Sequence, residues 1–203
     1  MNEDDIAQLI GRMSYDMPYI EYLVFFHADR DYFECHEIME EHWKACPASP
    51  LRQAWLGLIQ VAVAQYHERR NNLKGALIML TSAIGHLQQI RVEEIGLDSA
   101  ELMFRLEERK QQLEHRLAGT DEDGGAKRLS LEGVPFTDLN LPICDQRLEQ
   151  ACVELCQQRG RVWLKASDLS NEYLVHKHSL RDRSEVVSER RRRLREKQLK
   201  RQR

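Results

Sequence analysis

The segment of residues 51–69 carries apolar side chains on two opposite sides of a helix, and no other feature constrains the fold as strongly. On a wheel of about 100° per residue, Trp55 and Leu58 lie in one apolar stripe. Leu56 and Val63 lie in the stripe on the other side. Because such a helix needs packed neighbours on both sides, it belongs at the centre of a helical bundle. The sequence therefore predicts an all-α fold, organised as a compact helical bundle.

Further segments of residues 1–118 also have the spacing of buried helices. They are residues 19–26, 31–45, 73–87 and 98–117. The first of these is rich in aromatic and β-branched residues that would also suit a strand, but we favour a helix. Asn72 and Asp98 are of the residue types that cap helix N-termini. The helix after Asp98 has only one apolar face, so we expect it on the outside of the bundle.

The chain changes character after residue 118. Residues 119–125 include no large apolar side chain and have two adjacent glycines, which predicts a flexible linker over residues 119–130. Residues 131–203 are predicted to form a largely helical C-terminal extension. Within it, Pro142 is expected to open a helix that ends at Gly160. A basic terminal helix is expected to close the chain.

Charge is divided between the two ends of the sequence. Residues 181–203 hold 11 Lys and Arg against 4 Asp and Glu, which is a local charge of +7. The formal total is −3, so residues 1–180 carry −10. A basic block of this kind either stays solvated or meets an acidic protein or nucleic acid.

Composition and motifs exclude several classes of protein. No stretch approaches the ~18 consecutive apolar residues of a membrane span, and the acidic N-terminus is unlike a signal peptide, so we expect a cytoplasmic protein without membrane attachment. The 5 cysteines show no CxxC spacing and favour buried thiols over a disulfide framework. Phosphate-binding loops, nucleophile elbows and dinucleotide fingerprints are absent from the sequence.

Polar side chains occupy helical positions where the pattern requires apolar ones. His36 and Glu40 lie on the apolar face of residues 31–45, close to Trp43 on the wheel. Gln60 and His67 lie two turns apart within the central helix. Because burial of such groups without partners is costly, we expect an internal polar cluster between the two helices.

Two interpretations of this cluster remain open. In the structural interpretation, Glu40 accepts a hydrogen bond from His36 and the network fixes the register of the helices. In the functional one, His36, Glu40 and His67 bind a divalent metal or carry out acid–base chemistry. Residues 36–40 begin like the zinc-peptidase pattern His-Glu-x-x-His, but Glu40 stands where the second histidine would be, so a protease is not predicted.

The chain resembles a known prokaryotic family over about residues 18–90. The residues that carry the resemblance are the run 32–43, the run 57–60, His67, Asn71 with Asn72, and Gly75 with Ala76. They are similar to the signature of the family named domain of unknown function 309 (DUF309), which has an all-α fold. The runs 141–143 and 172–178 resemble a longer, bacillus-type branch of that family.

The resemblance also implies an activity, because some members are labelled predicted metal-dependent hydrolases. Carried over position by position, the characteristic polar residues of the family would be His36, Glu37, Glu40, Gln60 and His67, with Trp43 packing beside them. In the hydrolase hypothesis, His36, Glu40 and His67 would hold the metal and Glu37 would be the catalytic base. A divalent metal is the cofactor that this hypothesis requires.

Three functions therefore compete. The first is the metal-dependent hydrolase, in which a bound ion lowers the pKa of water. The second is a non-enzymatic module that binds an acidic protein or nucleic acid through residues 181–203. The third, of little specificity, is capture of an anion by Arg69, Arg70 and Lys74 near a helix N-terminus.

Overall fold

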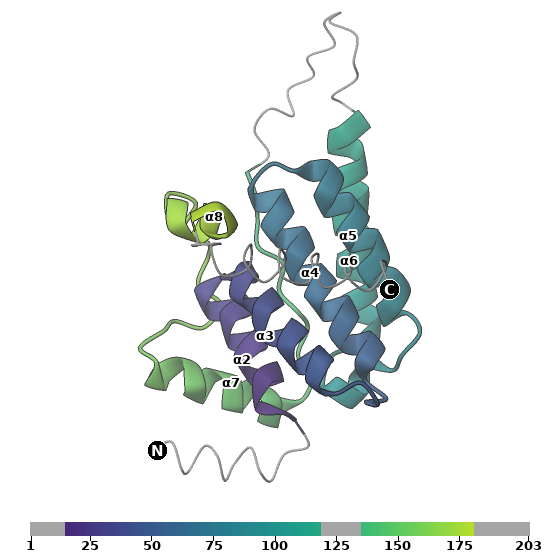
Figure 1. Ribbon diagram of the computed structural model, residues 1–203, viewed down its shortest axis with the longest axis vertical. Helices are drawn as coiled ribbons and strands as arrows, with labels where there is room; N and C mark the ends of the chain where they lie inside the picture. Colours follow the sequence, from purple (N-terminus) through teal and green to yellow (C-terminus); the bar gives the residue numbers. More distant parts are fainter. Residues whose placement is uncertain (1–14, 119–134, 181–203) are drawn as a thin grey trace, which may run out of the picture.

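The computed structural model describes residues 15–118 and 135–180 (Figure 1). Within these ranges the chain is helical apart from turns, irregular segments and one antiparallel bridge between Leu97 and Ile143. The predicted all-α fold is thus confirmed. Its elements are, in order, α2 (Met17–Val24), a π-helical turn η1 (Phe25–Asp29), α3 (Tyr32–Ala45), α4 (Arg52–Arg69), α5 (Leu73–Leu87), a 3-10 turn η2 (Val92–Ile95), α6 (Ser99–Ala118), α7 (Gln146–Gln158) and α8 (Glu172–Leu180).

From α2 to α6, helices that follow one another along the chain are also neighbours in space. Contacts join α2 to α3, α3 to α4, α4 to α5 and α5 to α6, and α7 packs against the other side of α2. Helix α4 is therefore central, as its two apolar sides predict, and most of its residues are buried. Helix α6 covers the bundle with the buried stripe Leu102, Leu106 and Leu113.

The close approach of α4 and α5 depends on Gly57. A Cβ atom added there would lie only 2.6 Å from Leu87 Cγ, and Leu87 is itself buried. Gly85 on α5 has open space at the corresponding position, with nothing within 4 Å. The first glycine therefore serves helix packing, whereas the second has no packing role.

The predicted helix over residues 19–26 is confirmed and continues further than expected. After Val24 the chain widens into η1, which ends at Arg30 in a left-handed conformation with φ 54°. Asp31 then starts α3, because its side chain accepts a hydrogen bond from Glu34 N at 3.1 Å. The turn between α2 and α3 is thus set by a residue whose backbone conformation is uncommon for a non-glycine residue.

The expected helix start at Pro142 is wrong. The structure begins α7 at Gln146, with Asp145 as the cap that accepts from Arg147 N at 2.8 Å. Residues 142–144 instead follow the backbone of residues 96–98, with Asp98 N donating to Pro142 O and Cys144 N donating to Gly96 O, both at 2.9 Å. Their pairing with this distant backbone outweighs the helix-starting tendency of proline.

The described part of the C-terminal extension shares the core of the bundle. Leu139, Leu141, Leu148 and Cys152 belong to the same buried cluster as the residues of α2–α6. The predicted linker and basic terminal helix lie outside the described residues, so the division into domains stays a prediction. Among the described helices none is both long and apolar enough to cross a membrane.

Candidate functional site

The signature residues of α3 do not lie where the helical wheel suggests. The buried side of α3 is formed by Tyr32, Cys35 and Met39. His36 and Glu40 flank this side, and their side chains are 31% and 39% exposed. The expectation that both are buried is wrong. A wheel centred on His36 and Trp43 misplaces the core, which lies about 60° away, towards Met39.

Each of these polar groups has a local partner. His36 Nδ1 is 3.2 Å from Glu37 Oε1, and Glu40 Oε1 is 3.0 Å from Lys44 Nζ one turn later. Glu37 is 35% exposed, so both members of the first pair reach solvent. The structure therefore brings His36 beside Glu37 and directs Glu40 towards Lys44.

The central helix contributes Gln60 and His67, both partly exposed. The Nδ1 atom of His67 is 2.9 Å from Asn72 Nδ2, next to the cap of α5. Burial, together with Arg70, lowers the pKa of His67. Gln60 Oε1 is a buried acceptor that finds no donor among the described residues. The predicted internal cluster of four polar groups is therefore not formed, and His36, Glu40 and His67 each have a separate local partner.

Trp43 packs beside this surface as expected, but its partner is Arg52. The guanidinium carbon of Arg52 lies 3.5 Å from the centre of the Trp43 ring, and its Nη1 donates to Trp43 O at 2.5 Å. This stack closes the turn between α3 and α4. No group of three or more His, Cys, Asp or Glu side chains within residues 15–118 and 135–180 is arranged to hold a metal ion. The ligand set of the hydrolase hypothesis is thus not assembled.

The most concentrated polar chemistry lies elsewhere, around Arg30. This side chain is 2% exposed and donates to three backbone carbonyls and one amide oxygen. The acceptors are Phe26 O at 3.0 Å, Leu139 O at 3.2 Å, Lys165 O at 2.7 Å and Asn140 Oδ1 at 2.8 Å. Arg30 therefore connects η1 to two separate segments of the extension.

Asp138 completes this arrangement from the extension. Its carboxylate accepts from Tyr32 Oη at 2.7 Å and from Ser167 N at 2.7 Å, and it lies 3.8 Å from Arg30 Nε. The sequence offered little sign of these contacts, because Asp138 lies more than 100 positions from both Tyr32 and Arg30. The available signal was a run of three charged residues, 29–31, at a helix boundary.

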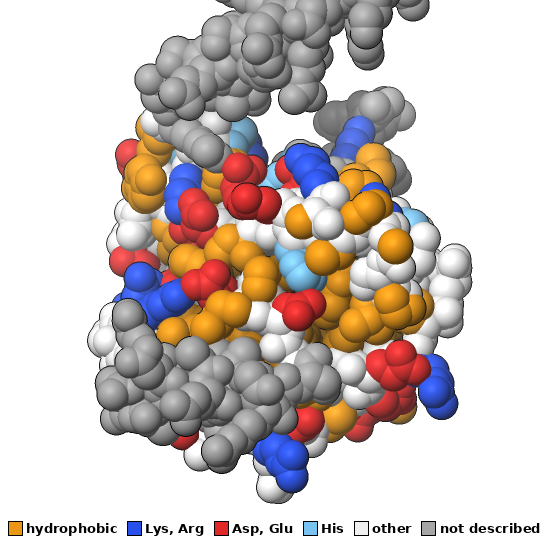
Figure 2. Space-filling view, turned by 60° about the horizontal axis from the view of Figure 1, so that its bottom comes forward, with side chains coloured by type: hydrophobic (Ala, Val, Ile, Leu, Met, Phe, Trp, Pro, Cys, Tyr) orange, Lys and Arg blue, Asp and Glu red, His pale blue; other side chains and the backbone are white. Residues whose placement is uncertain are grey.

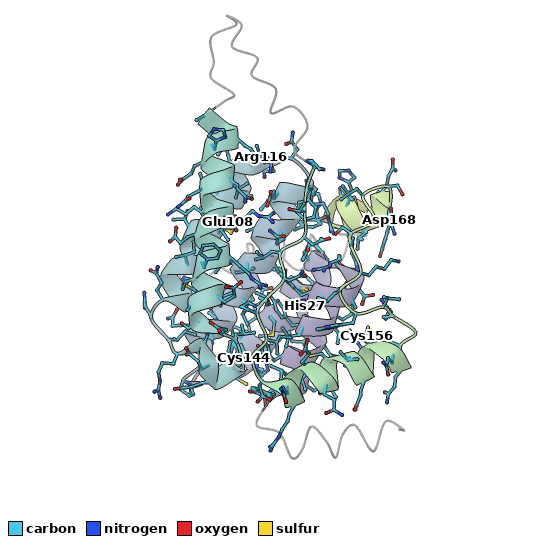
Figure 3. All side chains as sticks on the ribbon, turned by 180° about the vertical axis from the view of Figure 1, so that it is seen from behind. His27, Glu108, Arg116, Cys144, Cys156 and Asp168 are labelled. Atoms are coloured by element: carbon cyan, nitrogen blue, oxygen red, sulfur yellow. The ribbon has the colours of Figure 1, made fainter. Side chains whose placement is uncertain are left out.

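A second buried network lies between α4 and α6. Glu68 accepts from Arg109 Nη1 at 3.0 Å and from Arg116 Nη1 at 2.8 Å. Arg109 also donates to Thr137 O at 2.8 Å, and Gln65 Oε1 accepts from Leu139 N at 2.9 Å. Seen from behind, the segment that leads into α7 runs along the bundle beside α6, and Arg116 lies near the upper end of α6 (Figure 3). These charges thus hold the extended segment in place.

Helix α8 is attached to the bundle by three contacts. Lys177 Nζ lies 2.6 Å from Asp31 Oδ2 and 2.7 Å from Glu34 Oε1. Burial lowers the pKa of Lys177, but hydrogen bonds to these two carboxylates outweigh burial and raise it overall. Tyr66 Oη lies 2.9 Å from His178 Nδ1.

The third contact uses Arg69, which the sequence suggested as an anion ligand. Its Nη2 donates to Leu174 O at 2.9 Å and its Nη1 donates to Arg30 O at 2.6 Å. Both terminal nitrogens of Arg69 thus donate to backbone carbonyls of the chain itself. Burial lowers the pKa of Arg69. Part of this lowering is offset by four nearby side chains, namely Tyr32, Asp31, Asp138 and Tyr66.

His27 lies in the interior, on η1, and is 1% exposed (Figure 3). Its ring stacks on Trp163 of the extension, with 4.9 Å between ring centres. Burial lowers the pKa of His27 from 6.5 to about 3, and the charges of Arg30 and Arg105 act in the same direction. The side chain is therefore a neutral core group, which makes it unsuited to acid–base work near neutral pH.

One face of the described residues carries mixed charges. On the face shown in Figure 2, hydrophobic side chains gather in patches with acidic and basic side chains scattered among them, and no extended basic patch is visible. The described residues on this face therefore form no basic patch comparable to the +7 charge of residues 181–203.

Comparison with known proteins gives two matches. The model of the family described as domain of unknown function (DUF309) matches residues 19–79, which include all of α3 and α4. A protein of Bacillus subtilis (strain 168), named "Uncharacterized protein YpuF", is 41% identical over 178 residues, covering 87% of this chain and 92% of that protein. No solved structure shows a significant match.

Proposed function

The chain belongs to the DUF309 family, and from that premise we propose that it is a non-enzymatic binding module whose residues 181–203 bind nucleic acid. One observation carries this proposal: a segment of charge +7 follows a body of charge −10. A cationic segment of this kind binds polyanions by neutralising phosphates and releasing their counterions.

The attachment of α8 supports the same function. The basic segment follows Leu180, three residues after Lys177, which is bound to Asp31 and Glu34. The helical body thus presents the start of the segment from a defined position. An anchor of this kind lowers the entropy lost when a tethered segment binds its ligand.

Nucleic acid fits the composition of the segment better than an acidic protein does. Residues 181–203 include 11 Lys and Arg but no aromatic residue. Protein interfaces depend on a buried apolar and aromatic centre, whereas phosphate contacts need only cations. The absence of aromatic residues also argues against base stacking, so we expect binding that is independent of nucleotide sequence.

The test uses the full-length chain and a fluorescein-labelled DNA duplex. The variant Arg190→Gln/Arg191→Gln/Arg192→Gln/Arg193→Gln removes the longest basic run. The matched control neutralises four exposed cations of the body, namely Lys74, Arg91, Arg147 and Lys165. Fluorescence anisotropy at low and moderate salt gives the affinity and its salt dependence.

We expect the variant of the basic run to bind more weakly and with a smaller salt slope, by about 0.9 for each phosphate that is no longer neutralised. The control should retain most of the affinity of the unmodified chain. Equal losses of affinity in both variants, or no binding by the unmodified chain, would reject the proposal. Binding of acidic proteins without binding of DNA would favour the other partner class.

The metal-dependent hydrolase is the second candidate, because His36 and Glu37 are in contact and reach solvent. Metal content of the untagged, gently purified chain is the direct test, with His36→Ala as its control. Under our proposal the metal is far below one ion per chain. Near-stoichiometric metal that is lost in His36→Ala would instead justify a hydrolase screen, with Glu37 as base and His36, Glu40 and His67 as ligands.

A further inference from the structure

The outer face of α3 already binds one cation from the C-terminal extension. Lys177 of α8 lies within 2.7 Å of the carboxylates of Asp31 and Glu34, and only 12% of its side chain is exposed. This contact joins the last described helix to the first turn of α3. The carboxylates at the start of α3 thus already bind a lysine of the same chain.

The acidic row continues along α3 beyond this contact. Glu34, Glu37 and Glu41 are spaced by three and four residues, so they lie within about 60° of one another on the helix. We call these three residues the α3 acidic face. Glu34 and Glu37 are about one third exposed, with values of 33% and 35%, and Glu41 is exposed.

The chain itself supplies a segment of complementary charge. This segment begins after Leu180, which is three residues beyond Lys177. Its 23 residues carry a net charge of +7. Helix α3 has 14 residues and is about 21 Å long, a distance that 23 residues can span in either helical or extended form. We propose that residues 181–203 dock along the α3 acidic face of the same chain, continuing the interface that Lys177 begins.

The attachment point favours the same chain over a second copy. A short tether raises the effective concentration of the segment near its target to the millimolar range, well above ordinary protein concentrations. Ion pairs on a surface are individually weak and depend on such a concentration. Salt screens such ion pairs, so we expect added salt to weaken this docking.

Combined with the proposed function, this docking has a consequence for nucleic-acid binding. The α3 acidic face and the phosphates would compete for the same cations, so the face lowers the affinity of residues 181–203 for nucleic acid. Only this last step depends on the proposed function. The docking itself can be tested without any nucleic acid.

The direct test is zero-length carbodiimide cross-linking of the full chain, which joins lysine amines to carboxylates in contact. Isotopically labelled and unlabelled chains are mixed, so that mass spectrometry separates links within a chain from links between chains. We expect Lys197 or Lys200 linked to Glu37 or Glu41 within one chain. Links only to other carboxylates, only between chains, or no link from these lysines would overturn the proposal.

A second test uses the DNA affinity of two variants with equal net charge. Glu37→Gln/Glu41→Gln neutralises the α3 acidic face. Glu108→Gln/Glu114→Gln neutralises two exposed positions on α6, which lies behind the bundle as Figure 1 shows it and carries the Glu108 labelled in Figure 3. We expect roughly two- to ten-fold tighter binding at low salt for the first variant relative to the second.

The outcomes separate this proposal from the proposed function. Equal affinities of the two variants, with DNA still bound, would reject docking on α3 and leave the function standing. Failure of every variant to bind DNA would reject the function, and the cross-linking result would then decide the docking alone.

Discussion

Glu68 on α4 and Arg109 on α6 form an ion pair 3.0 Å long in which both side chains are at least nine-tenths buried. Arg116 adds a second contact to the same carboxylate at 2.8 Å. The pair joins the central helix α4 to α6, and Arg109 also donates to Thr137 O in the segment that leads into α7. It is therefore the charged contact whose removal should affect the fold most.

The variant Glu68→Ala should lose about 3–5 kcal/mol of unfolding free energy, because it leaves two guanidinium groups without their counter-charge. Urea unfolding measures this loss. As a control, Glu94→Ala removes the exposed pair with Arg91 and should cost less than about 1 kcal/mol. Comparable small losses for both variants would contradict the buried pair.

Removal of Glu40 distinguishes a surface position from a buried one. Its side chain is 39% exposed and pairs with Lys44, so Glu40→Ala should cost less than about 1 kcal/mol in urea unfolding. A loss of about 3–5 kcal/mol would be the signature of a buried charged pair and would restore the internal cluster that the sequence suggested.

The buried His27 gives the fold a pH dependence of defined sign. Its pKa is about 3 in the folded chain, held down by burial, against about 6.5 when unfolded. The unfolded chain thus binds one more proton than the folded chain between these values. The contribution of neutral His27 to the free energy of unfolding is therefore present in full above pH 6.5. It is lost as the pH decreases towards 3, with a slope approaching about 1.4 kcal/mol per pH unit.

Urea unfolding between pH 7.5 and pH 5 is the measurement, a window chosen because few carboxylates titrate there. The variant His27→Phe keeps an aromatic ring against Trp163 and should remove most of the slope, and His27→Gln serves if the larger ring does not fit. The exposed His115→Gln is the control and should keep the slope. An unmodified slope in the two His27 variants would show that another group is responsible.

Two glycines in neighbouring helices should respond in opposite directions to substitution. Gly85→Ala has open space and should raise stability by about 0.5–1 kcal/mol through helix propensity. Gly57→Ala forces a methyl group against Leu87 and should lower stability by about 1–3 kcal/mol. Thermal unfolding of both variants checks the pair, and stabilisation by Gly57→Ala would show that α5 can move away from α4.

Helix α4 shows how much of the fold the local sequence contains. Its two apolar sides predicted a central helix, and the caps Asn72 and Asp98 placed the starts of α5 and α6, since Asn72 Oδ1 accepts from Gly75 N at 3.0 Å and Asp98 Oδ1 accepts from Glu101 N at 2.9 Å. These features depend on residues three or four positions apart. Periodicity and capping therefore suffice to find them.

The α3 positions show where this reasoning fails. Phe33 and Trp43 place the predicted apolar face towards His36, although both aromatics are only partly buried in the structure. A helical wheel gives the relative directions of side chains but not which direction meets a neighbour. The rotation of α3 is settled by its packing on α2 and α4.

Local spacing and residue counts were enough to establish the all-α class, the order of the helices from α2 to α7 and the separation of charge between body and C-terminal segment, whereas α8 was not predicted. The packed structure was needed to show that Arg30 meets Lys165 O and Asp138, that Glu68 meets Arg109, and that His36 and Glu40 reach solvent. The first two relationships join residues far apart in the chain, and the third depends on how α3 is rotated. All three follow from how helices and the segments between them pack, which no local pattern encodes.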